Sequence, residues 1–304
     1  MSFPTVTAPE IFERYEAIRP RLPTAKFPTA SVAIENLEAL VDQIDIFLLD
    51  AFGVLNVGES AIPGAASRLE TFSRLGKQVF VLTNSATYDA ANALKKYREL
   101  GFVLTKEQVI SSRDAAIAAL AVYPGDYIWG VAATSQSGLS ELPCTFRLLG
   151  DNPDGFDEVD AFLLLSSAQW TVKQQELLRQ SIQKNSRPLV VGNPDLVAPR
   201  EVGLSLEPGY FAHEIADQTG ISPQFYGKPF SDVFERALEA VAAKGIDRRR
   251  IAMVGDTLHT DILGGAAAGV RTVLVTDHGF LKGMDIPGLI ARSGIVPDFI
   301  AATT

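Results

Sequence analysis

The segment Ile46-Phe47-Leu48-Leu49-Asp50-Ala51-Phe52-Gly53-Val54-Leu55 decides the fold of this chain. Its four leading apolar residues, followed by a glycine-containing turn, are typical of a short strand that is buried on both faces. A carboxylate at the end of such a strand is unfavourable unless its charge has a partner. In an open parallel sheet, ligands bind beyond the carboxyl ends of the strands. Asp50 is therefore expected to point into a binding site.

Length and composition indicate a globular α/β protein. The chain has 304 residues, of which 47% are hydrophobic and 21% charged, enough for one large domain or two of ordinary size. The net charge is −9 and the pI about 4.9, so the surface repels nucleic acid, and an anionic substrate would need a local metal ion or lysine. The single cysteine, Cys144, excludes an intramolecular disulfide and fits a reducing compartment.

Two further patterns concern location. The N-terminus has no basic region followed by an apolar core, so no secretory signal is visible. The apolar runs are too short to span a bilayer. We therefore expect a cytoplasmic protein without a membrane partner.

Strand-like and helix-like segments alternate in the order of a doubly wound sheet. The strand that ends at Asp50 is followed by a helix from Pro63-Gly64 to Leu75 and a second buried strand at 78–82, which is the parallel crossover unit. Further helices are expected at 8–19, 31–43, 86–100, 113–122, 172–185, 210–219, 231–244 and 261–269, and strands at 108–111, 127–131, 159–165, 188–192, 251–254 and 271–275.

The pattern of predicted elements changes after Pro124-Gly125, where a separate and less regular alternation of strands and helices begins. We interpret residues 123–208 as an inserted α/β cap domain. Residues 1–122 and 209–304 would then form the core, with residues 1–44 as a helical extension at its N-terminus.

Polar residues follow four of the strand-like runs. They are Asp50, Thr83-Asn84, Lys228, and Asp256 with Asp261. Each signal alone is more often structural: a turn Asp, a helix-capping Thr-Asn pair or a surface lysine. A doubly wound sheet, however, gathers the ends of its strands into one crevice. Their common placement therefore predicts a single site.

These residues stand in motifs that resemble those of the haloacid dehalogenase superfamily of aspartyl-phosphate hydrolases. The resemblance covers residues 45–276 and is strongest to the NagD-type class IIA members, which carry a large α/β cap between the second and third motifs. It implies a Rossmann-like core with the inserted cap. The resembling segments are Asp50-Ala51-Phe52-Gly53-Val54-Leu55, Val81-Leu82-Thr83-Asn84, Gly227-Lys228-Pro229 and Val254-Gly255-Asp256-Thr257-Leu258-His259-Thr260-Asp261.

The resemblance implies a role for each motif residue. Asp50 would be the nucleophile that forms an aspartyl phosphate. The carboxylates of Asp50 and Asp256 and the carbonyl of Phe52 would bind Mg²⁺, which prefers oxygen ligands. Asp261, further along, would hold a metal-bound water or orient Lys228.

The remaining implied residues concern the phosphoryl group and the substrate. Lys228 would offset the negative charge that nucleophile and phosphate share. The Thr83 hydroxyl and the Asn84 backbone N–H would bind phosphoryl oxygens at a helix start. Asn193-Pro194-Asp195 resembles a recurring cap segment, so Asn193 and Asp195 are candidate substrate-binding residues, although a plain Asn-Pro turn is an equal alternative.

The sequence departs from the family at Phe52. Phosphatases of the family carry a second Asp there, which protonates the leaving group and later activates water. A phenyl ring can do neither, and the loss of one general acid or base lowers the rate roughly 10²- to 10⁴-fold. Either another proton carrier acts, with His259 nearest in sequence and Glu59 and the cap as other candidates, or the enzyme prefers good leaving groups, or it does not hydrolyse its ligand. The alternative for His259 is an exposed helix residue.

The sequence therefore predicts a Mg²⁺-dependent hydrolase that acts on a small phosphorylated metabolite, such as a sugar phosphate, through an aspartyl phosphate. The alternative is a catalytically weakened protein of the same fold that binds phosphorylated metabolites and has a regulatory role. A dinucleotide enzyme is excluded because no Gly-x-Gly-x-x-Gly follows the first strand. A homodimer is a further expectation, since cap-mediated dimers are common in the resembling class.

Overall fold

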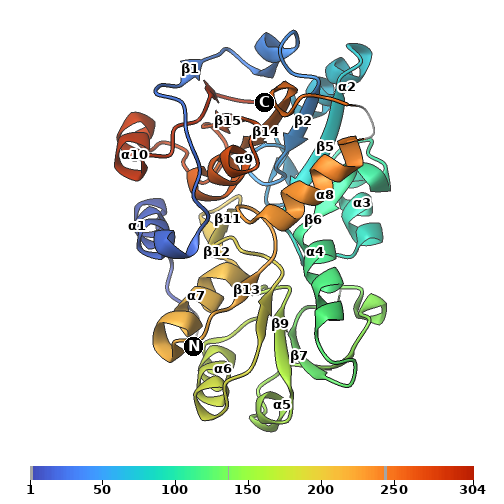
Figure 1. Ribbon diagram of the computed structural model, residues 1–304, viewed down its shortest axis with the longest axis vertical. Helices are drawn as coiled ribbons and strands as arrows, with labels where there is room; N and C mark the ends of the chain where they lie inside the picture. The colour runs from blue at the N-terminus through green and yellow to red at the C-terminus, as the bar shows by residue number, and fades with distance from the viewer. Residues whose placement is uncertain (1–2, 136, 243–244) are drawn as a thin grey trace.

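The computed structural model describes residues 3–135, 137–242 and 245–304, and two parallel sheets organise this part of the chain. The larger sheet lies in the upper part of Figure 1 and the smaller sheet in the lower part. No helix within these residues is long and apolar enough to cross a membrane.

The larger sheet has seven parallel strands in the order β1-β16-β15-β14-β2-β5-β6. From β2 the chain adds strands in one direction, and from β14 it adds them in the other. The order therefore reverses between β2 and β14, which confirms the predicted doubly wound fold. The strands are β1 (Val32–Ala33), β2 (Ile46–Leu49), β5 (Gln78–Thr83), β6 (Val109–Ser111), β14 (Ile251–Gly255), β15 (Arg271–Val275) and β16 (Phe299–Ala301).

Strand β2 is buried on both faces, as its apolar run predicts. Phe47 and Leu49 belong to one core cluster, where Phe47 stacks on Phe72 of helix α2 with 4.2 Å between ring centroids. Ile46 and Leu48 point into a second cluster beneath helix α8. The helices around this sheet are α2 (Ala65–Arg74), α3 (Ala90–Glu99), α4 (Ser112–Ala119), α8 (Ser231–Ala242), α9 (Leu263–Ala267) and α10 (Ile286–Ser293).

The smaller sheet has five parallel strands in the order β13-β10-β9-β7-β8. Its core joins Phe162 of β9 to Leu178 of α6 and to Ala212 of α7. The elements are β7 (Ile128–Ala132), β8 (Thr145–Leu148), α5 (Asp154–Asp157), β9 (Ala161–Leu164), α6 (Val172–Lys184), β10 (Leu189–Val191), α7 (Pro208–Thr219) and β13 (Gln224–Phe225).

This sheet does not end where the predicted insertion ends. Strand β13 pairs with β10, and α7 packs into the same core, so the interval 123–208 leaves out one helix and one strand of the smaller sheet. The sequence pattern places both elements in the core, because the alternation of helices and strands typical of a doubly wound sheet returns from Gly209. Contacts between distant segments, rather than local pattern, decide to which sheet they belong.

Two other local predictions differ from the structure. The helix expected at 31–43 is wrong: the segment forms β1 and a 3₁₀ helix at Leu37–Leu40, because the Asn36 side chain accepts the Glu38 N–H and caps a shorter turn. Helix α3 begins only at Ala90, where Asp89 accepts the Asn92 N–H. The end expected for α8 at Lys244 lies outside the described residues. The sequence did not predict strand β8 or the C-terminal elements α10 and β16. It also did not predict two hairpins, β3 (Asn56–Val57) with β4 (Ser60–Ala61) and β11 (Val197–Pro199) with β12 (Leu204–Leu206).

Helix α1 (Ala8–Ile18) matches the helix expected at 8–19. Thr7 forms a capping box with Glu10, and the apolar residues Ile11, Phe12, Tyr15 and Ile18 are buried. In Figure 1 this helix lies at the side of the molecule, with α10 above it and α7 below it. The N-terminal extension thus contacts parts of the chain that carry both sheets.

Candidate active site

The strand reversal between β2 and β14 places two carboxylates side by side. Asp50 directly follows β2 and Asp256 directly follows β14, and the Asp50 N–H donates to the Val254 carbonyl over 2.8 Å. Lys228 reaches the same point from the loop after β13. Its amine lies 2.6 Å from Asp50 Oδ1 and 2.8 Å from Asp261 Oδ1, and its side chain is 1% exposed. Three motifs predicted to converge are therefore in contact.

Asp50, Asp256 and Asp261 form an acidic cluster in which one carboxylate oxygen from each residue lies within 4.8 Å of the others. Asp256 is held by the Phe280 N–H at 2.6 Å and by the Thr257 hydroxyl at 2.9 Å. Gly53 and Gly279 contact the Asp256 side chain so closely that a Cβ would lie 2.5 Å and 2.0 Å from its Oδ2.

The charges in this cluster do not balance. Burial and the nearby charges of Asp261 and Asp256 raise the pKa of Asp50, although Lys228 opposes this. Burial and Asp261 raise the pKa of Asp256 to about 7. Burial alone would lower the pKa of Lys228, but Asp261 and Asp50 hold it above its ordinary value. One amine thus faces three carboxylates, a set of hard oxygen donors that fits a divalent cation such as Mg²⁺.

Asp261 differs from the other two carboxylates. Besides its contact with Lys228, it accepts the Thr257 N–H through Oδ2 at 3.1 Å and is fully buried. These contacts suit the orienting role that was predicted for it. Whether it also contacts a metal ion, and whether the Phe52 carbonyl does, stay predictions.

Thr83 and Asn84 lie at the end of β5, the neighbour of β2. The Thr83 hydroxyl accepts the Ser85 N–H at 3.1 Å. The Asn84 side chain connects Asp195 to the backbone of Lys228. Its amide donates to the Lys228 carbonyl and to Asp195, each at 2.8 Å, and its oxygen accepts the Lys228 N–H at 2.7 Å. Only the backbone N–H of Asn84 would then serve a phosphoryl oxygen, as predicted.

A cavity of about 270 Å³ opens above Asp50 and brings residues of both sheets together. Asn193 accepts the Asp195 N–H at 3.0 Å, and burial raises the pKa of Asp195 to about 7. Six predicted site residues line the cavity: Asp50, Phe52, Thr83, Asn84, Asn193 and Asp195.

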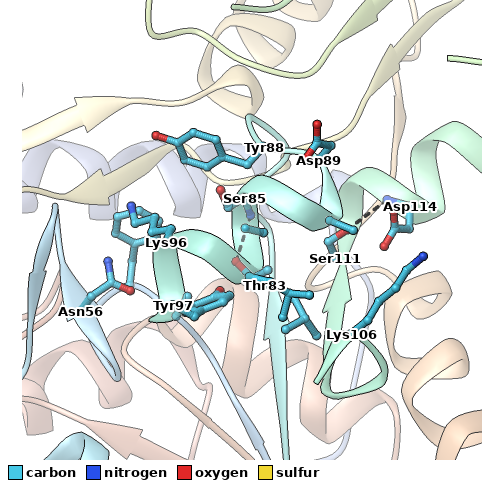
Figure 2. A pocket seen from close by; sticks show the side chains of 16 residues that line it. Asn56, Thr83, Ser85, Tyr88, Asp89, Lys96, Tyr97, Lys106, Ser111 and Asp114 are labelled. Carbon is cyan, nitrogen blue, oxygen red and sulfur yellow. Dashed lines mark hydrogen bonds between the residues drawn. The ribbon is translucent and has the colours of Figure 1, made fainter. Parts of the chain in front are cut away.

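A second, smaller cavity of about 80 Å³ lies beside the first, under helix α3. Figure 2 shows Asn56, Tyr97 and Thr83 around it, with Lys96 reaching over from α3. Phe52, Thr83 and Lys96 line both cavities. The Phe52 ring is therefore part of the wall that the two cavities share.

The Phe52 ring has cationic neighbours. The Lys96 amine lies 5.1 Å and the Arg200 guanidinium 5.2 Å from the ring centroid, within the range of cation–π attraction. Lys96 also pairs with Glu59 at 2.8 Å, and Arg200 with Glu207 at 3.1 Å. Sequence reasoning missed Lys96, Arg200 and Glu207, because they come from three distant segments and stand in no motif.

His259 does not take the position expected of a proton carrier, nor is it an exposed helix residue. It is fully buried, its Nε2 lies 2.5 Å from Glu16 Oε1, and its ring stacks on Tyr15 with 4.9 Å between centroids. It faces α1, which sequence reasoning did not connect with the site. Glu59, the other candidate, does line the larger cavity.

Comparisons with known proteins agree with this geometry. Residues 47–137 match the model of the haloacid dehalogenase-like hydrolases, and residues 225–301 match a HAD-hydrolase-like model. An acid sugar phosphatase of Staphylococcus aureus is 28% identical over 239 residues, which is 77% of this chain and 86% of the relative.

Solved structures are similar over most of the chain. A possible sugar phosphatase of the HAD superfamily from Cytophaga hutchinsonii has a TM-score of 0.79 at 27% identity and covers 90% of this chain and 98% of its own. A glycerol phosphate phosphatase from Mycobacterium tuberculosis, in complex with calcium, has a TM-score of 0.61 at 25% identity and covers 78% and 67%. With its two family matches, its fold and its converging motifs, this chain belongs to the haloacid dehalogenase-like hydrolases.

Proposed function

We propose that the protein is a Mg²⁺-dependent phosphatase that hydrolyses a small phosphorylated metabolite, such as a sugar phosphate, through an aspartyl phosphate. One observation carries the proposal: Asp50 contacts Lys228 at 2.6 Å within a cluster of three carboxylates, and of these three Asp50 lines the cavity. Named sugar phosphatases among the relatives support the substrate class.

Asp50, Asp256 and the Phe52 carbonyl would hold Mg²⁺. When bound, the ion would supply positive charge against the phosphoryl oxygens. An Asp50 oxygen attacks phosphorus in line, the ester P–O bond breaks, and the leaving oxygen departs with its electron pair and takes up a proton. Water then attacks phosphorus, the P–O bond to Asp50 breaks, and the proton that the water loses passes to solvent. Inorganic phosphate leaves and Asp50 returns as a carboxylate.

Lys228 has the contacts to support this nucleophile. Its amine touches Asp50 and Asp261, so it can stabilise the charge that builds up as the phosphoryl group approaches. The Thr83 hydroxyl and the Asn84 N–H, at the end of the neighbouring strand, would bind the equatorial oxygens.

The cavity above Asp50 suits a small polar leaving group. Its volume of about 270 Å³ is at the lower end for small-molecule sites, and Asn193, Arg200 and Glu207 contribute hydrogen-bonding groups to its wall. Such a wall can bind the hydroxyl groups of a sugar.

Phe52 limits the reaction to two routes. Either the leaving oxygen is stable enough to depart unprotonated, or another group supplies the proton. Glu59, which lines the same cavity and pairs with Lys96 at 2.8 Å, is the candidate for this role. Residues 123–208 as a cap, a homodimer and a cytoplasmic location stay predictions.

The test is phosphate release from p-nitrophenyl phosphate and from a panel of sugar phosphates, with Mg²⁺ and after chelation with EDTA. We expect turnover only with Mg²⁺, and none in the Asp50→Asn variant. Tight binding of a phosphorylated metabolite without turnover would overturn the proposal in favour of a binding and regulatory protein.

A further inference from the structure

The N-terminal segment that contains helix α1 connects helix α7, which packs on the smaller sheet, to helix α10, which packs near the larger sheet. Arg14 and Arg21 each pair with Asp217 of α7 at 2.5 Å, and the Phe3 ring packs on Phe211 of the same helix at 4.7 Å between centroids. On its other side, Glu13 of α1 pairs with Arg292 of α10.

Tyr15 is the residue of α1 that reaches the back of the active site. Its side chain is 2% exposed, and its hydroxyl accepts the Leu196 N–H at 3.1 Å. Leu196 directly follows Asp195, which lines the catalytic cavity and accepts the Asn84 amide at 2.8 Å. One hydrogen bond thus connects the tyrosine hydroxyl directly to the segment that carries Asp195.

Tyr15 also contacts the segment that carries Asp256 and Asp261, and its ring packs edge-on against Phe280, whose N–H holds Asp256. Its ring stacks on His259 at an interplanar angle of 7°, and Glu16 holds that imidazole through Nε2. The negative charges of Asp195, Asp256 and Asp261 reinforce the effect of burial, which raises the pKa of the Tyr15 hydroxyl. The hydroxyl therefore lies within the field of all three carboxylates.

We propose that Tyr15 is a positioning residue of the phosphoryl site: it sets the distance between the Asp195 segment and the Asp256–Asp261 segment. This inference rests on the proposed function and assigns part of it to a helix outside both matched family regions. Tyr15 lies behind both segments, so it acts through Leu196 and His259 and does not touch substrate.

The variant that tests this is Tyr15→Phe, which removes one oxygen and leaves the packed ring. Its matched control is Tyr127→Phe, because Tyr127 is a partly buried tyrosine that packs on Tyr123. We expect Tyr15→Phe to lower kcat roughly 10-fold, the scale of lost outer-shell contacts, while Tyr127→Phe keeps the parent value. A lower unfolding temperature with unchanged kcat would show a purely structural role and overturn the inference.

Binding of orthovanadate in the presence of MgCl₂, measured by calorimetry, separates this inference from the proposed function. If the parent protein binds vanadate but has no turnover, the proposed function fails, and an approximately 10-fold weaker affinity of Tyr15→Phe would still support positioning. Equal affinities of parent and variant would overturn it.

A second measurement does not depend on the variant folding. With 3-fluorotyrosine incorporated at position 15, we expect the ¹⁹F resonance to shift when MgCl₂ and orthovanadate are added together, because the hydroxyl is coupled to the Asp195 segment. An unchanged resonance at saturating vanadate would contradict the proposal.

Discussion

Asn84 donates a hydrogen bond to Asp195 across 2.8 Å and thereby joins the end of a strand in the larger sheet to a loop 111 residues further along the chain. Replacing Asp195 with Ala leaves a buried amide donor without this partner, which costs about 1–3 kcal/mol of stability. We expect kcat/KM for the best substrate to fall roughly 10- to 100-fold, because Asn84 also holds both backbone groups of Lys228. Asp154→Ala, at an exposed carboxylate, is the control; equal effects of both variants would contradict a specific role.

A matched control for the nucleophile lies at the opposite end of strand β2. Asp45 precedes β2 and pairs with Lys77 and Arg250, whereas Asp50 follows the same strand. We expect Asp50→Asn to lower kcat by roughly 10⁴-fold or more, as removal of a covalent nucleophile does, and Asp45→Asn to keep it within about twofold. Residual turnover of Asp50→Asn near the parent rate would exclude attack by this residue.

Lys228 and a divalent cation should each be able to stabilise the folded protein by offsetting the charge of the buried carboxylates. Lys228→Met leaves Asp50 and Asp261 buried without their common partner, at about 3–5 kcal/mol of unfolding free energy. We expect Mg²⁺ to raise the unfolding temperature of this variant by more than that of the parent, measured by calorimetry. Lys77→Met, which removes an amine paired at the sheet end, should respond as the parent does. Equal increments for Lys228→Met and the parent would argue against a shared site.

Phe52 offers a gain-of-function test. Phe52→Asp restores an acid where the family carries one, and Lys96 and Arg200 are placed to keep it charged or to release its proton. We expect a rise in kcat of about 10²-fold for an alkyl phosphate and a smaller one for p-nitrophenyl phosphate, whose leaving oxygen needs no proton. Phe52→Asn, with the same shape and no acid, is the control. An unchanged or lower rate for Phe52→Asp would mean that another group already has this role.

His213 gives the stability of the fold a pH dependence. Burial, together with Arg21 and Arg14, lowers its pKa from 6.5 to about 3 in the folded state. The unfolded chain therefore binds a proton below pH 6.5 that the folded chain does not, and stability falls as the pH drops from 6.5 towards 3. At pH 5 the loss from this group is about 2 kcal/mol. His213→Phe, which retains the stacking on Phe225, should flatten the dependence of the unfolding temperature between pH 7 and 5. A variant with the slope of the parent would contradict this account.

Local patterns predicted the larger sheet well, because its central strands are continuous apolar runs. The four side chains of strand β2 pack in two core clusters. The continuous apolar run of the strand predicts this burial. Strand β8 was missed because three of its four residues are exposed, so neither alternation nor an apolar run marks it. The segment at 31–43 has a helical spacing of apolar residues, yet pairing with β16 and the Asn36 cap override it.

The site was predicted where a residue follows a strand, and missed where it comes from elsewhere. The convergence of Asp50, Lys228 and Asp256 follows from strand order alone. The contacts of Tyr15 and Glu16 with His259 span more than 240 residues and leave no trace in local spacing.

Strand β13 has a mechanical consequence. It is the edge strand of the smaller sheet, and it ends at Phe225, three residues before Lys228. A movement of the smaller sheet relative to the larger one would therefore displace the backbone of Lys228, whose ammonium group contacts Asp50. Access for a metabolite and the contact between Lys228 and Asp50 would then change together.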